Sequence, residues 1–391
     1  MKLNVGNPVE GEDFFDREKE QQGAWRKLES SHLLMLAPRR IGKTSLILRL
    51  CDTAHAHGFQ AVQCSFARCG DEQECVSLLF HTLAEQQARW ERLVDPLKTV
   101  LGKLKGVKIG PVGIDWQSGK PADWREVGDA LGKVLDSGDS PWLICVDEVP
   151  VFVINLIKQG EDGKRRARAF LNWFRDLRQR HYKQVKWLLA GSIGLDTIAA
   201  RLGWGDTIND LEPFPLAAFD EIAALAFLDK LAVSYNLPLQ ESARHAIVRR
   251  VGWPVPYYLQ VMFSQLRDDW ADNGIKPDEA AVERAFERLL DPAYRVHFDY
   301  WRQRLDEELG QPEAGHAILL LDHACQDTNG LSRDALGQAL STRIHDPDER
   351  DRILRYLLDV LGGDGYLVKR DDGRHAFRME MLRVYWQRRL R

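Results

Sequence analysis

The segment Ala37-Pro-Arg-Arg-Ile-Gly-Lys-Thr-Ser45 has the residue types of a loop that binds phosphate. An apolar run ends just before it, at Leu36, and a helical stretch over 46–51 follows it. In such a loop, main-chain N–H groups at a helix N-terminus converge on an anion, a lysine reaches the β- and γ-phosphates, and a Ser or Thr hydroxyl binds Mg²⁺. We therefore expect Lys43 to contact ATP and Thr44 to bind ATP and Mg²⁺. The remaining residues expected to bind ATP here are Pro38, Arg39, Arg40, Ile41, Gly42 and Ser45.

The loop departs from the usual pattern at its first position, where Ala37 replaces a glycine. A side chain is tolerated there only if φ is negative. The alternative interpretation is a basic turn that caps a surface helix. The strand-like run before the loop and the helical stretch after it favour the phosphate loop.

A second acidic element follows the apolar run Leu143-Ile-Cys-Val146, which ends in Asp147 and Glu148. A carboxylate at the end of a buried strand typically holds the Mg²⁺ shell in enzymes with a phosphate loop, so Asp147 is the predicted metal residue. Successive strand residues point to opposite sides, which leaves Glu148 to polarise the attacking water as general base. Alternatively, the two carboxylates form an ordinary acidic strand-to-loop junction.

Further candidates are less specific. Ser192 follows the apolar run 187–190 and could hydrogen-bond the γ-phosphate or the water, although Gly-Ser is also ordinary turn chemistry. Phe15 and Arg17 precede the first strand, where an aromatic ring could rest on adenine or a helix could simply begin. Pro254 lies in the turn Gly252-Trp-Pro-Val-Pro256, which either contacts the base or separates two helices. Three arginines are candidates for stabilising charge in the reaction, or are solvated residues of helix faces: Arg201, Arg249 and Arg250.

The elements that must position these residues change in character along the chain. Short β-branched runs at 32–36, 60–65, 142–146 and 186–190 alternate with helical stretches, which indicates parallel strands joined by crossover helices. From Pro215 onward helical periodicity dominates, over 218–235, 241–251, 257–271, 278–290 and 293–309. Three helices and a hairpin with an Asp-Asp-Gly turn at 365–378 then suggest a winged helix. The sequence predicts an α/β P-loop NTPase core with a parallel sheet at 1–214, with an inserted β-hairpin at about 104–117, an all-α lid at 215–310 and a winged helix at 311–391.

Charge limits the partners. The 391 residues carry 54 Lys and Arg against 58 Asp and Glu, a formal net charge of −4, so DNA contact would have to be local. Residues 312–391 hold equal numbers of basic and acidic side chains, and acidic residues open the third helix of the expected winged helix. DNA could be contacted by a basic wing, formed by Lys369, Arg370, Arg374 and Arg378. The segment could equally well dock a protein or rest on its own ATPase core.

Cysteine usage and hydropathy indicate the compartment. The six cysteines form no Cys-x-x-Cys pair, which favours reduced thiols over disulfides or a zinc site. The first residues contain no apolar stretch of signal-peptide length, and no apolar run approaches the roughly 20 residues that span a bilayer. We expect a cytoplasmic, soluble protein without a membrane partner.

The order of the motifs resembles the archaeal-type branch of STAND and AAA-related ATPases over nearly the whole chain. The segments that carry the resemblance are Phe15-Asp-Arg-Glu18, Pro38–Ser45, Val146-Asp-Glu148, 170–175, 191–194, Gly252-Trp-Pro254 and 377–383. The resemblance implies an additional-strand P-loop core, a helical lid and a C-terminal winged helix. It also implies an ATP-dependent switch that acts beside a partner protein, in some lineages in genome maintenance or in defence against mobile elements.

Taken together, the residues and the resemblance predict a Mg²⁺-dependent ATPase that acts as a molecular switch. Its nucleotide state would be relayed through the lid and winged helix to a partner protein or DNA, with a homo-oligomer as one form of assembly. Two alternatives remain: a nucleotide-gated binding module that hydrolyses little ATP, and a DNA-binding regulator whose ATPase core is vestigial. No arginine finger is identifiable from the sequence, and such a residue is worth about 10³–10⁵ in rate.

Overall fold

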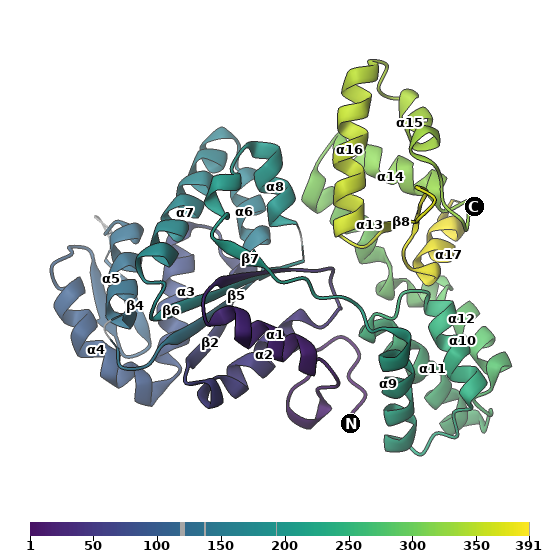
Figure 1. Ribbon diagram of the computed structural model, residues 1–391, viewed down its shortest axis with the longest axis horizontal. Coiled ribbons are helices and arrows are strands. Elements are labelled where there is room, and N and C mark those ends of the chain that lie inside the picture. The colour runs from purple at the N-terminus through teal and green to yellow at the C-terminus, as the bar shows by residue number, and fades with distance from the viewer. Residues whose placement is uncertain (118–121, 137, 193, 391) are drawn as a thin grey trace. The chain divides into compact units, whose positions relative to one another are not determined.

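A computed structural model describes residues 1–117, 122–136, 138–192 and 194–390 (Figure 1). It divides into two compact units, which we call the core unit and the helical unit. The core unit comprises Arg17–Ala37 and Lys43–Leu216, and the helical unit comprises Met1–Asp16, Pro38–Gly42 and Ala217–Arg391. Residues 38–42 of the phosphate-loop sequence thus group with the helical unit, whereas Lys43 and Thr44 of the same sequence belong to the core unit. The three-domain division at 214 and 310 stays a prediction.

The core unit contains a five-stranded parallel sheet in the order β2-β5-β6-β1-β7. Its strands are β1 (His32–Leu36), β2 (Gln60–Ser65), β5 (Trp142–Asp147), β6 (Val185–Gly191) and β7 (Leu211–Pro213). The four strands expected from apolar runs are confirmed. The fifth, β7, was not expected, because three residues that include a proline carry no strand periodicity. Strand β6 lies between β1 and β5, as the resemblance to additional-strand ATPases implies.

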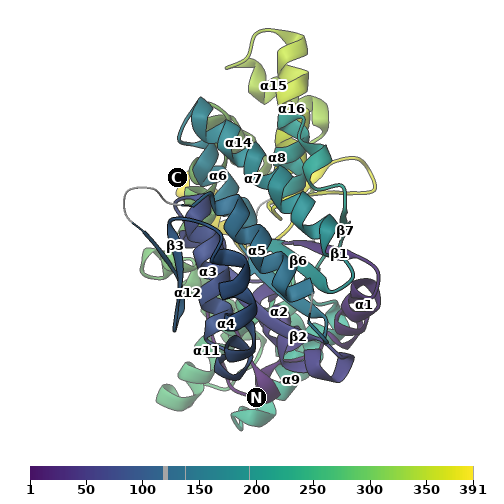
Figure 2. The ribbon, with the colours of Figure 1, turned by 90° about the vertical axis from the view of Figure 1, so that its left-hand side faces the viewer.

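Helices cover both faces of this sheet (Figures 1 and 2). Helices α1 (Glu18–Leu28) and α2 (Lys43–Thr53) lie on one face, and α3 (Glu72–Ala84), α5 (Trp124–Asp136), α6 (Val149–Ile157) and α7 (Glu161–Arg180) lie on the other. Aromatic rings fill the second interface: Trp187 on β6 meets Phe174 on α7 edge to face, with ring centroids 4.8 Å apart. Such rings bury large apolar areas, so this face forms the main core.

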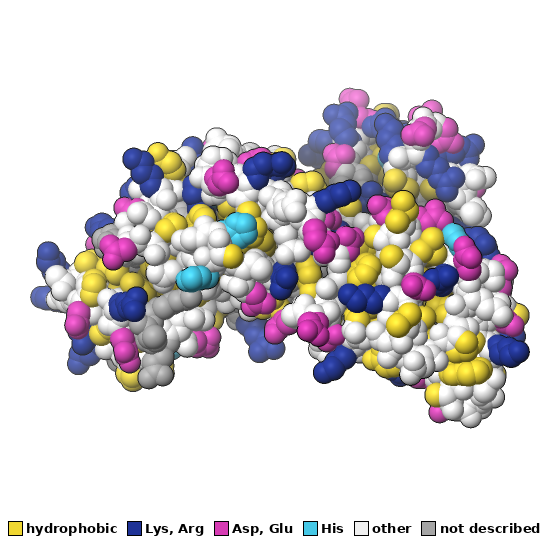
Figure 3. Space-filling model, turned by 60° about the horizontal axis from the view of Figure 1, so that its bottom comes forward, with side chains coloured by type: hydrophobic (Ala, Val, Ile, Leu, Met, Phe, Trp, Pro, Cys, Tyr) yellow, Lys and Arg dark blue, Asp and Glu magenta, His cyan; other side chains and the backbone are white. Residues whose placement is uncertain are grey.

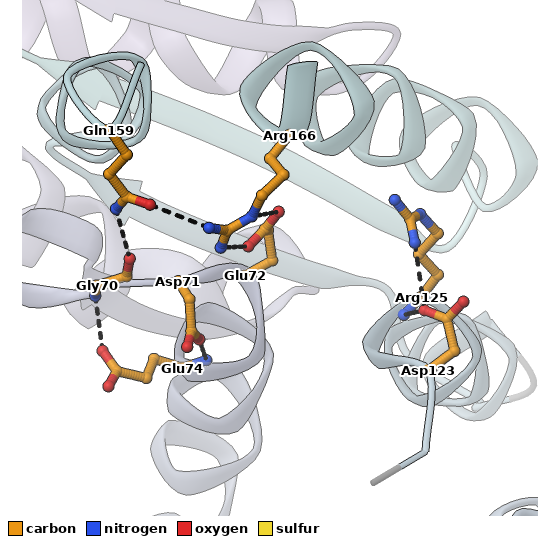
Figure 4. Close-up of polar contacts among 8 residues, drawn as sticks. All are labelled: Gly70, Asp71, Glu72, Glu74, Asp123, Arg125, Gln159 and Arg166. Carbon is orange, nitrogen blue, oxygen red and sulfur yellow. Dashed lines mark hydrogen bonds and ion pairs between the residues drawn. The ribbon is translucent and has the colours of Figure 1, made fainter. Parts of the chain in front are cut away.

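Polar contacts tie the start of α3 to α7 (Figure 4). Asp71 caps α3 by accepting a hydrogen bond from the Glu74 N–H at 2.9 Å. The side chain of Glu72, 4% exposed, pairs with the guanidinium of Arg166 on α7, whose Nε donates to Glu72 Oε1 at 3.1 Å. Arg166 also donates to Gln159 at 3.0 Å. These contacts fix the loop after β2 against the α6–α7 corner, on the side of the sheet where the strands end.

The rest of the core unit is peripheral to the sheet. Helix α4 (Gln87–Leu101) precedes a two-stranded antiparallel hairpin, β3 (Val107–Gly110) and β4 (Gly113–Trp116), in the segment where a hairpin was predicted. Helix α8 (Leu195–Leu202) follows β6.

The helical unit begins with α9 (Glu221–Ser234), α10 (Glu241–Val251), α11 (Pro256–Asn273) and α12 (Glu279–Leu289). The single helix expected over 293–309 is wrong. A 3₁₀ helix, η5 (Pro292–His297), is separated from α13 (Asp299–Leu309) by Phe298, whose φ of −127° is not helical and whose side chain is fully buried. Burying this ring interrupts the helix.

Three helices and a hairpin complete the unit. Helices α14 (Glu313–Ala324), α15 (Arg333–Ser341) and α16 (Pro347–Gly363) precede the antiparallel strands β8 (Leu367–Lys369) and β9 (His375–Phe377), and α17 (Glu380–Arg389) ends the described chain. The order agrees with the expected winged helix, whose assignment stays a prediction. Asp346, at the start of α16, caps it by accepting from the Glu349 N–H at 2.7 Å. Acidic residues at this end therefore stabilise the helix terminus.

No helix among the described residues is long and apolar enough to cross a membrane. Basic and acidic side chains are interspersed over the face displayed in Figure 3. This mixed surface agrees with the near balance of charge in the sequence.

Candidate functional site

The carboxyl ends of three neighbouring strands of the core unit bring the predicted catalytic residues together. Leu36 at the end of β1 pairs with Gly191 at the end of β6, and the Ala37 N–H extends this ladder to the Gly191 carbonyl at 3.2 Å. Strand β5 pairs with β6 and ends at Asp147. Residues that follow these strands therefore lie at one edge of the sheet, where ligands of open α/β folds bind.

The lysine and threonine of the loop sequence lie at the first turn of α2, against β5. The Thr44 hydroxyl donates a hydrogen bond to Asp147 Oδ2 at 2.9 Å. The Lys43 ammonium donates to the Ala37 carbonyl at 2.6 Å. Lys43 is 6% and Asp147 7% exposed, so both charges are almost fully withdrawn from water. Burying charged groups in this way is costly, which makes the pair a strong candidate for a functional site.

The environment of Asp147 favours a cation beside it. Burial raises the pKa of this carboxyl, and the charge of Glu148 raises it further. The Lys43 ammonium and the hydrogen bond from Thr44 oppose the rise in pKa. A divalent cation at the carboxylate would act in the same direction as Lys43 and favour the ionised form.

Glu148 faces Ser192 on the neighbouring strand end. Its Oε2 accepts hydrogen bonds from the Ser192 N–H at 3.2 Å and from the Ser192 hydroxyl at 3.0 Å. The strand ends at Asp147, and Glu148 has φ 55° and ψ 35°, a left-handed conformation at the start of α6. Glu148 therefore does not continue the strand, and the expectation that strand alternation separates the two carboxylates is wrong. Glu148 lies in the left-handed turn after the strand, and its carboxylate pairs with Ser192, whereas Asp147 pairs with Thr44.

Gly191 allows the close approach of α6 to this strand end. A Cβ at this position would lie 2.4 Å from ring atoms of Pro150. The side-chain-free residue thus lets the helix that begins after Glu148 pack against β6, beside Ser192.

The donor set fits Mg²⁺ and a phosphate chain. The Thr44 hydroxyl and the Asp147 carboxylate are hard oxygen ligands of the type that Mg²⁺ takes together with substrate phosphates and water. Gly42 has φ 105°, a backbone conformation that only glycine adopts without strain, and apart from its chain neighbours no described atom lies within 4 Å of where its Cβ would be.

The other predicted binding residues take varied positions. In the helical unit, Phe15 packs on Phe219 and Phe227, with centroids 5.8 and 5.3 Å away, and the Pro254 carbonyl accepts from the Phe219 N–H at 3.2 Å. Phe15 and Pro254 therefore share a neighbour, and base contact by either stays a prediction.

In the core unit, Arg17 is buried and its Nη1 pairs with Glu20 at 2.7 Å. Three further loop residues are buried: Pro38, Ile41 and Ser45. Arg39 is half-buried.

Most of the predicted basic wing makes internal contacts. Arg370 donates to the Thr328 carbonyl at 2.9 Å and Arg374 to the Gly330 carbonyl at 3.0 Å. The Arg378 guanidinium lies over the Trp253 ring at 4.9 Å, and burial lowers its pKa. Lys369 is exposed. Arg370 and Arg374 are also exposed, and hydrogen bonds to carbonyls leave their charge intact. The charge of Arg374 is offset in part by Asp327 at 3.7 Å and Asp372 at 3.8 Å.

The arginines considered for a charge-stabilising role also have partners. Arg249 donates to Glu279 at 2.5 Å, and Arg250 to Glu283 at 2.8 Å. Arg201 is exposed on α8. Arg249 and Arg250 are therefore each paired with a glutamate carboxylate.

The aromatic residues that contact the Arg40 side chain were not predicted from the sequence. Its guanidinium lies between the rings of Tyr257 and Tyr300, on α11 and α13 of the helical unit. Nothing in the spacing of these tyrosines marks them, since both fall in ordinary helical stretches. The available signal in the sequence was the pair Arg39-Arg40, because two adjacent guanidinium groups that are partly withdrawn from water need carbonyl, carboxylate or aromatic partners.

Comparison with known proteins establishes the fold. No family model matches the chain, and no curated protein is similar to it in sequence. Among solved structures, the Walker-type ATPase of Pyrococcus abyssi is similar over 98% of this chain and 99% of its own, with 19% identity and a TM-score of 0.67. The ORC2 protein of Aeropyrum pernix, solved in complexes with ADPNP and ADP, is similar over 97% of both chains, with 14% identity and a TM-score of 0.56. The chain has the α/β P-loop NTPase fold, followed by a helical C-terminal region.

Proposed function

We propose that the protein binds Mg·ATP at the strand ends of the core unit and hydrolyses it, as a nucleotide-controlled switch. The observation that carries the proposal is the 2.9 Å hydrogen bond from Thr44 to Asp147, formed beside the buried ammonium of Lys43. A hydroxyl at a helix start, a strand-end aspartate and a lysine are the three side chains that bind Mg·ATP in phosphate-loop enzymes. The similarity in fold to two nucleotide-related proteins supports the proposal.

Each residue has a defined role in this mechanism. Lys43 would exchange its hydrogen bond to the Ala37 carbonyl for the β- and γ-phosphates, and Thr44 and Asp147 would hold the metal. When bound, Mg²⁺ neutralises charge on the β- and γ-phosphate oxygens. Glu148 would accept a proton from the attacking water, and Ser192 would orient the Glu148 carboxylate through its two hydrogen bonds.

The nucleotide state is proposed to control the binding of a partner protein. Arg374 lies beside Asp327 and Asp372, and Arg378 lies over the Trp253 ring, so the exposed Lys369 and Arg370 carry the DNA alternative. The family resemblance adds a homo-oligomer, and genome maintenance or defence against mobile elements, as the setting of the proposal.

The test of the site is a thermal shift titration with ATP or ADP and Mg²⁺. At 100 times its Kd, a ligand stabilises the native state by about 2.7 kcal/mol, and Lys43→Ala should remove most of this gain. The control, Lys98→Ala, replaces an exposed lysine of the same unit and should leave the shift intact. Chelating Mg²⁺ should reduce the shift with ATP. A wild-type protein that shows no shift, or a Lys43→Ala variant that keeps it, would refute the nucleotide site.

Hydrolysis needs its own measurement. Removing a general base typically costs about 10²–10⁴ in rate, so Glu148→Gln should lose most ATPase activity while it keeps the thermal shift. Phosphate release by the wild type and by Glu148→Gln, with the Lys43→Ala variant as the blank, decides the point. Equal rates in the wild type and Glu148→Gln would remove Glu148 from the mechanism.

A further inference from the structure

Arg40 has an unusual backbone conformation for its residue type. Its φ is 68°, in the left-handed region that glycine adopts freely and that costs other residues free energy. It lies two residues before Gly42, in the middle of the phosphate-loop sequence. Because a strained residue persists only when its surroundings hold it, the contacts of its side chain matter.

The side chain is held from three directions, all within the helical unit. The guanidinium carbon lies 3.8 Å from the ring centroid of Tyr257 and 4.3 Å from that of Tyr300. One guanidinium nitrogen donates to the His297 carbonyl at 3.1 Å. We call Arg40, Tyr257, His297 and Tyr300 the arginine clamp. Two aromatic faces and a carbonyl suit a planar guanidinium and do not suit the compact ammonium of lysine.

The aromatic partners are themselves fixed. The Tyr257 hydroxyl and His297 Nδ1 lie 2.7 Å apart, and the Tyr258 hydroxyl donates to the same His297 carbonyl at 3.0 Å. The Tyr300 hydroxyl lies 3.3 Å from that of Tyr258. The clamp therefore connects the start of α11, the end of η5 and the start of α13 in one hydrogen-bonded group.

A second loop arginine acts on the same helices. Burial is the main cause that raises the pKa of Glu308 on α13 to about 8, and the charge of Arg39 is one of the contributions that oppose this rise. Both side chains of the double arginine thus interact with the helical unit.

We propose that Arg40 is a positioning residue that transmits phosphate binding from the loop backbone to α11 and α13. Phosphate held by main-chain N–H groups of the loop fixes the backbone at residue 40 and therefore fixes the guanidinium between the two rings. The helices that carry the rings then become more ordered. This inference rests on the proposed nucleotide site and assigns the route by which the helical unit senses it.

Hydrogen exchange measured by mass spectrometry tests the clamp. In the wild type, ADP or Mg·ATP should slow exchange in peptides covering the start of α11 and residues 292–300. The expected slowing is about fivefold or more, the lower end of the usual coupling between two sites of one protein. At nucleotide concentrations that saturate each variant, set by its own thermal shift titration, Arg40→Ala and Arg40→Gly should lose this response. The two variants differ in backbone strain, so a loss in both assigns the effect to the side chain. Arg40→Lys should also lose most of the response.

Matched variants keep the test independent of folding. Arg250 lies over the Phe286 ring at 4.9 Å in the same unit and pairs with Glu283, so Arg250→Ala removes an arginine–aromatic contact that does not involve the loop and should respond like the wild type. Tyr300→Phe keeps the ring and should keep the response, whereas Tyr300→Leu should lose it. If Arg40→Ala binds nucleotide and its peptides respond as in the wild type, the clamp is refuted while the site survives. If the wild type binds no nucleotide, both proposals fall.

Discussion

At the scale of single residues, the pairing of Glu148 with Ser192 determines where a water molecule could be activated. Both hydrogen bonds from Ser192 end on the same carboxylate oxygen, Oε2. The other oxygen is left to accept a proton. A carboxylate that two donors already orient loses less rotational freedom on reaching the transition state than a freely rotating carboxylate does, which favours proton transfer.

Ser192→Ala should reduce kcat for ATP without changing KM. The variant removes the hydroxyl donor and keeps the main-chain N–H, so we expect a loss of about tenfold to a hundredfold, the equivalent of one hydrogen bond to a charged group. Steady-state ATPase assays of Ser192→Ala, Glu148→Gln and the exposed control Ser30→Ala measure this. A rise in KM would instead assign Ser192 to direct contact with the nucleotide.

The residues of the site differ in how far the sequence predicts them. The Lys43–Thr44–Asp147 group was predictable, because a loop motif fixes a helix start and parallel strands end at a common edge. The left-handed turns at Arg40 and Glu148 were not, since a non-glycine residue with positive φ leaves no pattern in the sequence. Both depend on tertiary contacts: the aromatic pair in one case, and Ser192 with the start of α6 in the other.

At the scale of elements, β1 begins with a buried histidine that ties it to β6 and α7. His32 Nδ1 accepts from the Trp187 N–H at 3.2 Å, and Nε2 lies 3.1 Å from the Arg178 carbonyl. These partners require a neutral ring that carries its proton on Nε2. Its pKa falls from 6.5 to about 4, mainly through burial and then through the charge of Arg178, and the hydrogen bond to the Arg178 carbonyl and the charge of Asp210 oppose the fall.

The stability of the core unit should therefore fall as the solution is acidified. The unfolded chain binds a proton at His32 below pH 6.5 and the folded chain only near pH 4, so this contribution is complete above pH 6.5 and is lost between pH 6.5 and 4. Its size is about 3 kcal/mol. Urea unfolding of the wild type and of His32→Gln, which can make both hydrogen bonds and stays neutral, should show a flatter pH dependence in the variant. His57→Gln, at an exposed ring, is the control, and equal slopes for all three proteins would contradict the assignment.

Elements were predictable where the sequence pattern was long. Strands β1 and β2 and helix α10 begin and end where the apolar periodicity predicts. Strand β7 and the break at Phe298 were not, because a three-residue strand is defined by its pairing with β1, and the break by the burial of one ring. Both are consequences of packing between segments distant in the chain.

At the scale of the whole molecule, the division into two units predicts that unfolding is not a single transition. Each unit has its own buried polar contacts. In the core unit, the Arg178 guanidinium makes two hydrogen bonds of 2.8 Å to Asp210. In the helical unit, Arg304 on α13 is 1% exposed and pairs with Glu308 and with Asp364, the latter at 3.1 Å. A change at either cluster should be sensed first by its own unit.

Arg304→Met should destabilise the helical unit and leave the core unit unchanged. The substitution leaves the carboxyls of Glu308 and Asp364 buried without the charge that offsets their desolvation, which typically costs about 3–5 kcal/mol. Hydrogen exchange across a urea series should show early loss of protection in peptides from α13 and α16, while peptides from β5 and β6 keep their wild-type midpoint. The control Arg249→Met breaks an exposed pair with Glu279 in the same unit and should cost about 1 kcal/mol or less. Simultaneous loss of protection in both units would mean that the chain unfolds as one cooperative body.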